Sequence, residues 1–280
     1  MVALPKRPEQ EVVDRIYDAI KAEDTKSEIY LGRLGSSSLG DSCLRAVFLS
    51  WRAYESSNFS GRMLRIFGTG HWQEARVVED LQRAGFNVWD KDASGNQYEY
   101  VDETEHFISK VDGVLKGYPG CVEKPHVLEI KTHNKSSFSS LLKYGVQVSK
   151  PVHYTQMQSS LMLSGMTRAV YVAVCKDDEQ IYVERIKEDK PVQAGITKRI
   201  QTLVDARLKP AGISEDPLNS KLCMFCNVKN VCAGAVQAQR TCRSCRASCA
   251  IANGEWYCEL HGVSLTKEAQ RAACEFYEVL

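Results

Sequence analysis

The stretch that most constrains this chain runs from residue 106 to residue 134, HFISKVDGVLKGYPGCVEKPHVLEIKTHN. Its pattern predicts two strands, Phe107–Leu115 and Val127–Thr132, joined by a polar loop that contains glycine and proline. Paired strands fix the face on which each side chain points. The polar residues of this stretch can therefore be placed from the sequence.

The second predicted strand alternates apolar and charged side chains. Leu128 and Ile130 point to one face and can enter a core, whereas Glu129 and Lys131 point to the other. Asp112, on the first strand, approaches Glu129 if the strands pair. Two carboxylates and a lysine on the exposed side of a hairpin predict a Mg²⁺ or Mn²⁺ site, because these ions prefer oxygen ligands. A solvated charged stripe is the alternative.

A long helical pattern precedes this hairpin, and a helix–strand–strand pattern follows it. This order resembles the PD-(D/E)xK nuclease superfamily. The resemblance implies an α/β, restriction-endonuclease-like core, α-β-β-β-α-β, with a mixed sheet flanked by helices. It also implies that Asp112, Glu129 and the carbonyl of Ile130 bind metal, and that Lys131 acts on the attacking water.

The segment 61–85 predicts an amphipathic helix. His71 and Glu74 are three positions apart and can share a face of it. The exposed polar face of a packed helix is the alternative. RecB-type nucleases carry a histidine on the helix before the sheet, and His71 in GTGHWQEA resembles it. The resemblance implies that His71 is a metal ligand and that Glu74 supports the site.

A second helix is predicted over 151–164, PVHYTQMQSSLMLS. Its Tyr154-Thr-Gln156-Met-Gln158 resembles the Y-x-Q-x-Q helix of YqaJ-type and lambda-type phage exonucleases. The resemblance implies that Gln156 contacts nucleic acid or the site lysine, and that Tyr154 binds nucleic acid. The Q-x-x-x-Y pattern of RecB-type enzymes is only half met, because Ser160 stands in the last place.

The overall charge gives no general attraction to nucleic acid. The net charge of the 280 residues is +1, so DNA contacts must come from local basic patches. The amphipathic segment 191–208 carries Lys198 and Arg199, which could follow a phosphate backbone. A solvated helix face is the alternative.

The cellular compartment is predicted from the lack of membrane-spanning and signal-peptide patterns in the sequence. No stretch approaches the roughly 20 apolar residues needed to span a bilayer, and the first residues have no apolar signal-peptide core. We therefore expect a cytoplasmic protein without membrane contact. Eleven cysteines in such a chain favour metal binding over disulfides.

Three cysteines form the pattern C-x2-C-x5-C: Cys223, Cys226 and Cys232. Tetrahedral zinc or a 4Fe–4S cluster needs four ligands, and Cys43 is the natural fourth. This arrangement resembles the Fe–S staple of CRISPR-associated adaptation exonucleases and AddB-type helicase–nucleases. The resemblance implies a 4Fe–4S cluster that pins the N-terminal segment to the end of the core, and zinc is the alternative.

The tail holds a second set of candidate ligands: Cys242, Cys245, Cys258, His261 and Cys274. The spacing is typical of zinc sites. Either His261 or Cys274 completes the set, and we prefer Cys274 because it also anchors the end of the module. About 40 residues need such a staple to fold. The module could contact DNA through nearby arginines (Arg240, Arg243 and Arg246), dock a partner, or serve as a structural appendage.

Four parts are expected along the chain: a helical segment with a cluster cysteine (1–60), a nuclease core (61–210), an Fe–S segment (211–235) and a zinc module (236–280). We predict a metal-dependent DNA exonuclease that acts on single- or double-stranded ends in phage or bacterial recombination or repair. A recombinase or single-strand-binding protein is its expected partner. The alternatives are a non-catalytic DNA-binding accessory protein and an endonuclease of the same superfamily. Asp112, Glu129 and Lys131 argue against the first, since a binding module does not use them.

Overall fold

Five strands form the main sheet of the computed structural model, which describes residues 7–24, 29–56 and 59–280. In the order of the sheet they are β2 (Asn87–Trp89), β5 (Gly113–Lys116), β6 (His126–His133), β7 (Arg168–Cys175) and β8 (Ile181–Lys187). Strands β6 and β7 run parallel, and the other neighbours run antiparallel. The prediction of an α/β fold with a mixed sheet is confirmed.

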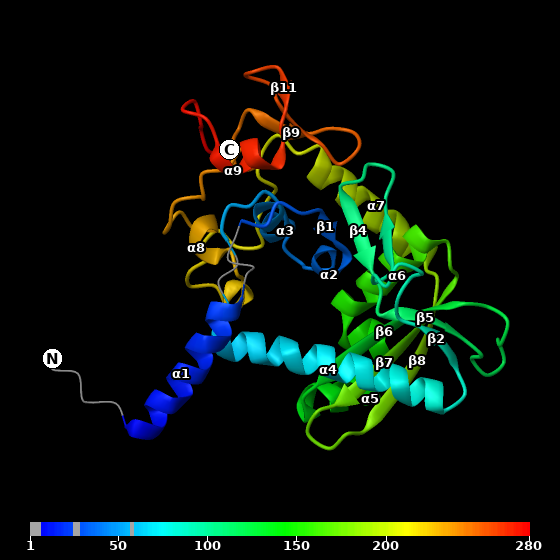
Figure 1. Cartoon of the computed structure of the whole chain (residues 1–280). Helices are drawn as coiled ribbons and strands as arrows, with labels where there is room; N and C mark the ends of the chain where they lie inside the picture. Colours follow the sequence, from blue (N-terminus) through cyan, green and yellow to red (C-terminus); the bar gives the residue numbers. More distant parts are fainter. Residues whose placement is uncertain (1–6, 25–28, 57–58) are drawn as a thin grey trace.

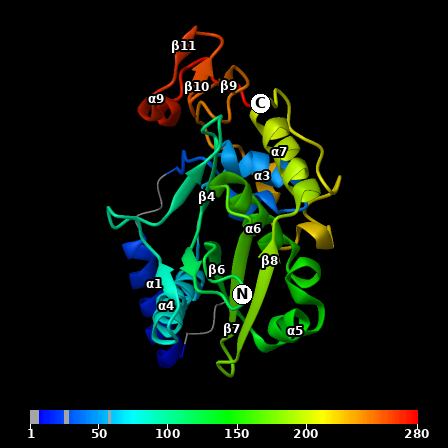
Figure 2. The same cartoon turned by 90° about the vertical axis from the view of Figure 1, so that its right-hand side faces the viewer.

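Helices cover both faces of this sheet, as Figure 2 shows. Leu128 and Ile130 pack with Val77 and Val78 of α4 (Gly61–Arg83) on one face. On the other face, β6 and β7 pack against α5 (Lys135–Ser149) and α6 (Pro151–Ser164). The order α4, β2, β5, β6, α6, β7 therefore matches the expected α-β-β-β-α-β, with β3 (Glu99–Val101), β4 (Phe107–Lys110) and α5 inserted.

The predicted length of the first strand of the hairpin is wrong. Residues 107–115 do not form one strand, because the chain leaves β4 at Lys110 and begins β5 at Gly113. Strand β4 joins a small sheet, β1-β4-β3, in which β1 (Leu34–Gly35) runs parallel to it. Asp112 lies in the break between the two sheets, not on a strand.

The remaining helices lie around this framework (Figure 1): α1 (Pro8–Glu23), α2 (Ser36–Leu39), α3 (Leu44–Trp51), α7 (Lys190–Val204), α8 (Lys229–Cys232) and α9 (Lys267–Ala272). Helices α3, α7 and α8 share one hydrophobic cluster, which Trp256 of the tail also enters. The tail adds a three-stranded sheet of β9 (Ser248–Ala250), β10 (Trp256–Cys258) and β11 (Val263–Ser264). The two ends of the chain thus build one core together.

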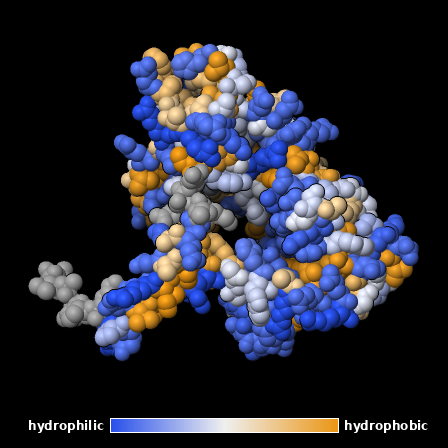
Figure 3. Space-filling model, in the orientation of Figure 1, coloured by the Kyte–Doolittle hydropathy of each residue, from blue (hydrophilic) through white to orange (hydrophobic). Residues whose placement is uncertain are grey.

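Helix α1 projects from the body and contacts α4 (Figure 1). It carries a strip of exposed apolar side chains, Val12, Val13 and Ile16, which Figure 3 shows along the helix. Across the described ranges, every helix is too short or too polar to cross a bilayer.

Candidate active site

The break between β4 and β5 places Asp112 against the middle of β6. Its Oδ2 accepts a hydrogen bond from the backbone N–H of Ile130 at 2.7 Å, and its own N–H donates to the carbonyl of Leu128 at 3.2 Å. Gly113 is needed here for packing, because a Cβ at this position would lie 2.9 Å from the carbonyl oxygen of Trp89. Asp112 is therefore held by backbone contacts on both sides of the break.

Glu129 and Lys131 lie beside Asp112, on the shared face that alternation predicts. The ammonium of Lys131 is paired with Glu129, lies 3.8 Å from Asp112 Oδ2, and donates to the carbonyl of Ile130 at 3.2 Å. The expected exposed position of Glu129 is wrong, since the residue is 0% exposed. Strand β6 is central in the sheet, and α5 and α6 pack over the face to which Glu129 points.

The charges of this trio are strongly coupled. Burial raises the pKa of Glu129 to about 7, although neighbouring Lys131 acts to lower it. Burial alone would lower the pKa of Lys131, but the carboxylates of Glu129 and Asp112 outweigh it and raise this pKa. Lys131 is therefore an ammonium at neutral pH.

One oxygen of Glu129 has no protein donor. Its Oε1 faces the ammonium of Lys131, while its buried Oε2 has no hydrogen-bond partner among the described residues. A buried carboxylate oxygen is costly to leave unsatisfied. The atom fits a bound cation, and with Asp112 and the Ile130 carbonyl it offers the hard oxygen ligands of Mg²⁺ or Mn²⁺.

Helix α4 brings His71 and Glu74 to the same place. Both line a pocket of about 780 Å³ together with Lys131. The pKa of Glu74 is raised by burial and then by the nearby carboxylate of Asp112. The two side chains therefore share a face of the helix that points to the trio, and their roles stay predictions.

The sequence reasoning missed a hydrogen-bonded cluster at the far end of this pocket. His133 Nε2 and His153 Nδ1 each lie 2.8 Å from the hydroxyl oxygen of Tyr171, which pairs in register with Glu129. Burial lowers the pKa of His133 to about 4, with further contributions from the charges of Lys150 and then Lys131. Burial also lowers the pKa of His153 to about 3, with Lys131 as the next contribution. Alternation along the strand places His133 on the same face as residues 129 and 131, so the sequence did indicate its position. His153 lies on α6, and only tertiary packing brings it to the cluster.

The two α6 residues predicted to bind nucleic acid are only partly accessible. Gln156 is 8% exposed, and among the described residues it does not line the pocket of Lys131. The hydroxyl of Tyr154 donates to Asp189 Oδ2 at 3.1 Å, at the start of α7. Both roles stay predictions.

Helix α7 carries the other two predicted contacts. Lys198 is exposed, whereas Arg199 is partly buried and donates to the carbonyl of Asp41 at 2.5 Å. Arg199 thus ties α7 to the loop before Cys43. Contact of either side chain with phosphates stays a prediction.

The first set of predicted cysteine ligands lines one pocket of about 270 Å³: Cys43, Cys223, Cys226 and Cys232. The pKa of Cys226 is raised by burial and further by the thiols of Cys223 and Cys43, which lie close to it. In the part of the chain that the structure describes, no group of three or more His, Cys, Asp or Glu side chains is placed so that it could hold a metal ion, which applies to both cysteine sets and to the group around Glu129. The four thiols are therefore neighbours that do not form a ligand shell.

The second set also gathers in one place, since all five candidates line a pocket of about 280 Å³: Cys242, Cys245, Cys258, His261 and Cys274. Burial raises the pKa of Cys242 to about 11, with further contributions from the thiols of Cys245, Cys274 and Cys258. His261 Nε2 lies 3.4 Å from the Sγ of Cys274.

One of the three arginines of the tail is buried, whereas Arg240 and Arg246 are exposed. Arg243 is 4% exposed and donates to the carbonyls of Leu31 at 2.8 Å and Gly32 at 2.6 Å, so the prediction that it contacts DNA is wrong. Arg246 is exposed and paired with Glu278 at 2.6 Å. Burial of the guanidinium was invisible in the local sequence.

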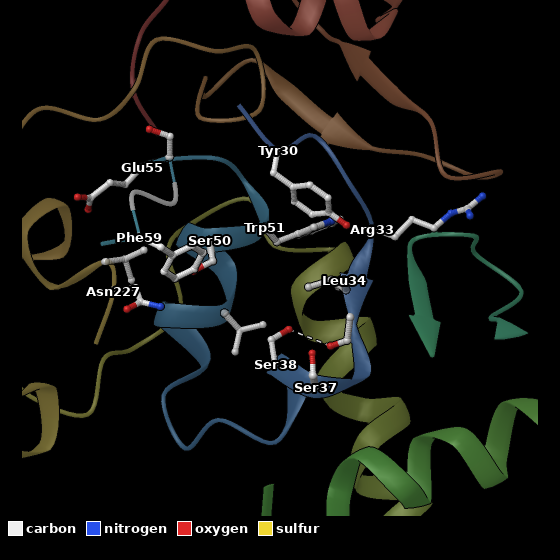
Figure 4. Close-up of a pocket in the computed structure, with 14 residues that line it drawn as sticks. Tyr30, Arg33, Leu34, Ser37, Ser38, Ser50, Trp51, Glu55, Phe59 and Asn227 are labelled. Carbon is white, nitrogen blue, oxygen red and sulfur yellow. Dashed lines mark hydrogen bonds between the residues drawn. The ribbon is translucent and has the colours of Figure 1, made fainter. Parts of the chain in front are cut away.

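A separate pocket of about 380 Å³ lies against α3, away from the trio (Figure 4). Rings of Tyr30, Trp51 and Phe59 and several serine hydroxyls surround it. Ser38 uses its hydroxyl locally, donating to the carbonyl of Gly35 at 2.8 Å. None of Asp112, Glu129 and Lys131 lines this pocket, whereas Lys131 lines the pocket of His71 and Glu74.

Comparison with known proteins gives a loose structural likeness. No protein-family model and no curated protein matches the chain. An alkaline exonuclease (LHK-Exo) from Laribacter hongkongensis is 18% identical with a TM-score of 0.44, covering 66% of this chain and 90% of that one. The crystal structure of LHK-Exo in complex with dAMP is 16% identical with a TM-score of 0.40, covering 68% of this chain and 89% of that one. The crystal structure of SSO0001 is 16% identical with a TM-score of 0.46, covering 81% of this chain and 98% of that one. With TM-scores below 0.5 this likeness carries no argument, and the case for function stands on the chain's own residues.

Proposed function

We propose that this chain is a metal-dependent DNA exonuclease of the PD-(D/E)xK type, with a restriction-endonuclease-like core. The observation that carries the proposal is the buried Glu129, whose Oε2 lacks a protein donor while Asp112 and Lys131 stand beside it. A purely structural carboxylate at 0% exposure would have its oxygens satisfied by the protein.

The residues fit a hard divalent cation. Glu129 and Asp112 would hold Mg²⁺ or Mn²⁺ with the carbonyl oxygen of Ile130, and His71 would complete the set. Oδ2 of Asp112 accepts a hydrogen bond from the Ile130 N–H, which would fix the carboxylate in place for such an ion. When bound, such an ion polarises a phosphoryl oxygen and lowers the pKa of water.

Lys131 would act as a hydrogen-bond donor. Its raised pKa keeps it protonated at neutral pH, held by both carboxylates and open to the pocket through a side chain that is 25% exposed. From this place it orients the attacking water and stabilises charge that develops on the scissile phosphate. Glu74 and His71 border the same pocket, where they help to position the water.

DNA ends are the proposed substrate. The Tyr154–Gln158 helix and the cysteine pattern resemble exonucleases, which favours digestion from an end over internal cutting. Gln156, Tyr154, Lys198 and Arg199 are the proposed DNA contacts. The proposed setting is recombination or repair in a phage or bacterial cytoplasm, with a recombinase or single-strand-binding partner.

Both cysteine sets would hold metal. A 4Fe–4S cluster on Cys43, Cys223, Cys226 and Cys232 would lock the start of α3 to the segment around α8, which already share a hydrophobic cluster. The tail set would hold Zn²⁺. Both centres are structural in this proposal.

The test is a nuclease assay on the full chain, purified without oxygen, with single- and double-stranded DNA labelled separately at each end and Mg²⁺ or Mn²⁺ present. Lys131→Ala is compared with Lys187→Ala, a matched lysine that is exposed on β8. Progressive shortening by wild type and Lys187→Ala, abolished in Lys131→Ala, is expected. Fragments of fixed internal length would indicate an endonuclease. Intact DNA with a folded, metal-loaded protein would leave a non-catalytic DNA-binding protein.

A further inference from the structure

Three pockets of this molecule are linked by side chains that line two of them. Phe59 lines both the pocket of Lys131 and the pocket against α3. Tyr30 and Arg33 line both the α3 pocket and a third pocket, of about 650 Å³. The three pockets therefore form one continuous path, which we call the binding path, and it ends at the proposed active site.

Aromatic rings occur at successive steps of the binding path. Phe67 lines the pocket of Lys131, is 40% exposed and meets Phe59 edge to face, with 5.0 Å between the ring centres. In the α3 pocket Phe59 is joined by Trp51 and by Tyr30, which is 69% exposed. Figure 4 shows the latter three rings around one space. Accessible rings are platforms for unpaired bases, because every base has a face that stacks.

The α3 pocket also contains a hydrogen-bond donor and an acceptor without partners. Trp51 is 5% exposed, and its indole N–H has no acceptor among the described residues. Glu55 lines the same pocket, and its buried Oε2 has no donor among them. Buried polar atoms are normally hydrogen-bonded. The edge of a nucleobase offers acceptors and N–H donors together, so it matches both groups, whereas Glu55 would repel a phosphate.

The third pocket supplies positive charge beside these rings. Arg33, Lys110 and Lys267 line it together with the carboxylate of Glu99. Glu99 pairs with Arg33 at 3.2 Å and with Lys110 at 3.4 Å, and Arg33 also pairs with Glu105 at 3.4 Å. Lys267, at the start of α9, is exposed. In Figure 4 the guanidinium of Arg33 points away from the rings of the α3 pocket. Cations at this place suit the phosphates that link successive bases.

We propose that the binding path holds single-stranded DNA. An unpaired base occupies the α3 pocket, where Tyr30 and Phe59 supply ring faces. The adjoining phosphates contact the cations of the third pocket, and the strand reaches the active site past Phe59. A base inside a duplex cannot bind in this way, because pairing covers its edge and stacking covers its faces. The inference rests on the nuclease proposed above and narrows its substrate to single-stranded ends.

The substrate class is tested by binding in EDTA, where metal-dependent cleavage does not take place. The full chain is titrated into a fluorescein-labelled oligothymidylate of about 16 nucleotides and into a blunt duplex of the same length, and anisotropy is measured. We expect the single strand to bind at least about tenfold more tightly than the duplex. Equal affinities overturn the proposal. Thymidine monophosphate is the competitor for the second arm, since a free nucleotide shares the same chemistry. Displacement of the oligomer by an equal concentration of the monophosphate overturns the strand and leaves a nucleotide site.

The ring contacts are tested by paired substitutions in the same assay. Tyr30→Ala and Phe59→Ala should each weaken oligothymidylate binding by about fivefold or more, because each removes a stacking platform, and Tyr30→Phe should stay within about twofold of wild type. Trp72→Ala is the matched control, because Trp72 is 62% exposed on α4 but lines none of the three pockets. Unchanged binding by Tyr30→Ala, or an equal loss in Trp72→Ala, overturns the ring contacts. If Phe59→Ala does not fold, the exposed Tyr30 still decides.

The phosphate contact is tested through the dependence of binding on salt. Lys267→Ala should reduce the slope of log Kd against log salt concentration by about 0.7, the share of one phosphate contact on a single strand. Lys187→Ala changes an exposed lysine outside the three pockets and should keep the wild-type slope. An unchanged slope in Lys267→Ala overturns the phosphate contact.

A cleavage assay in Mn²⁺ separates this inference from the proposed function. Tight binding of the single strand without cleavage would overturn the nuclease and leave the binding path. Cleavage of duplex ends alone, unaffected by Tyr30→Ala, would overturn the binding path and leave the nuclease.

Discussion

The main sheet and the C-terminal module each contain a buried charged group, and the two groups are of opposite sign. In the sheet it is the carboxylate of Glu129, which is paired with Lys131 and has one oxygen without a donor among the described residues. In the module it is the pair Arg52 and Arg243, which have carbonyl acceptors but no carboxylate among the described residues. The sheet thus buries a carboxylate beside its own counter-ion, whereas the module satisfies two buried guanidiniums with neutral acceptors.

The two regions also differ in how they hold these side chains. Glu129 is fixed by the central strand β6, and Asp112 is fixed by backbone hydrogen bonds to that strand. The tail cysteines lie instead on short turns and strands around one pocket.

The largest effect is expected from Glu129→Gln. Removing the buried negative charge should reduce DNA cleavage by about 10³-fold or more, since a metal ligand is lost. The same change should leave the melting temperature in EDTA equal to or above that of wild type, because an unsatisfied buried carboxylate disappears. Cleavage and thermal unfolding are measured on one preparation. A large drop in melting temperature with full activity would break the comparison.

The next effect is on pH dependence. Because the pKa of Glu129 is raised to about 7, Mn²⁺ must displace a proton below that pH, and its affinity should fall up to about tenfold per pH unit. In EDTA the raised pKa stabilises the fold at low pH, and this contribution is lost as pH rises from about 4.5 through 7. Titration of Mn²⁺ and urea unfolding across pH 5–8 measure both. Glu129→Gln should show neither slope.

A smaller effect is expected from Gly113→Ala. The new methyl group would lie 2.9 Å from the Trp89 carbonyl and displace β5 from β2, costing about 1–3 kcal/mol of unfolding free energy and moving Asp112. Gly195→Ala is the control, because a Cβ on this residue of α7 meets nothing within 4 Å and should stabilise by about 0.5–1 kcal/mol. Urea denaturation measures both. Equal stabilities would show that the break tolerates a side chain.

The smallest effect is expected from Arg246→Ala. This arginine and Glu278 form a pair whose side chains are 61% and 66% exposed, so its loss should change the unfolding free energy by less than about 1 kcal/mol. Chemical denaturation in low and high salt measures it. A clear loss of DNA affinity instead would revive a DNA-contact role for this arginine.

Local patterns predicted the parts of these sites that lie close in sequence. Alternation placed Glu129 and Lys131 on one face, and cysteine spacing gathered each set around one pocket. The burial of Glu129 was missed because it depends on β7, a parallel neighbour that is remote in sequence. The break at Asp112 was missed although Asp112-Gly113 is a pair typical of turns, because the apolar residues on either side continue a strand-like pattern. Pairing with two different sheets divides them.

The burial of Arg243 was also missed because it depends on residues that are distant in the sequence. A charged residue between two cysteines is expected at the surface, but its guanidinium is buried and donates to the carbonyls of residues 31 and 32. Sequence spacing identifies what can bind a metal, but the charge around it depends on segments far along the chain.

The bond between Arg52 and the carbonyl of Arg243 joins residues 191 positions apart. A ribosome adding about 5–20 residues per second needs roughly 10–40 s to make that interval. Throughout this time α3 has been synthesised but lacks the partner that covers Trp51 and Arg52. Until the tail has been made, the end of α3 therefore lacks the contacts that bury Arg52 in the folded protein.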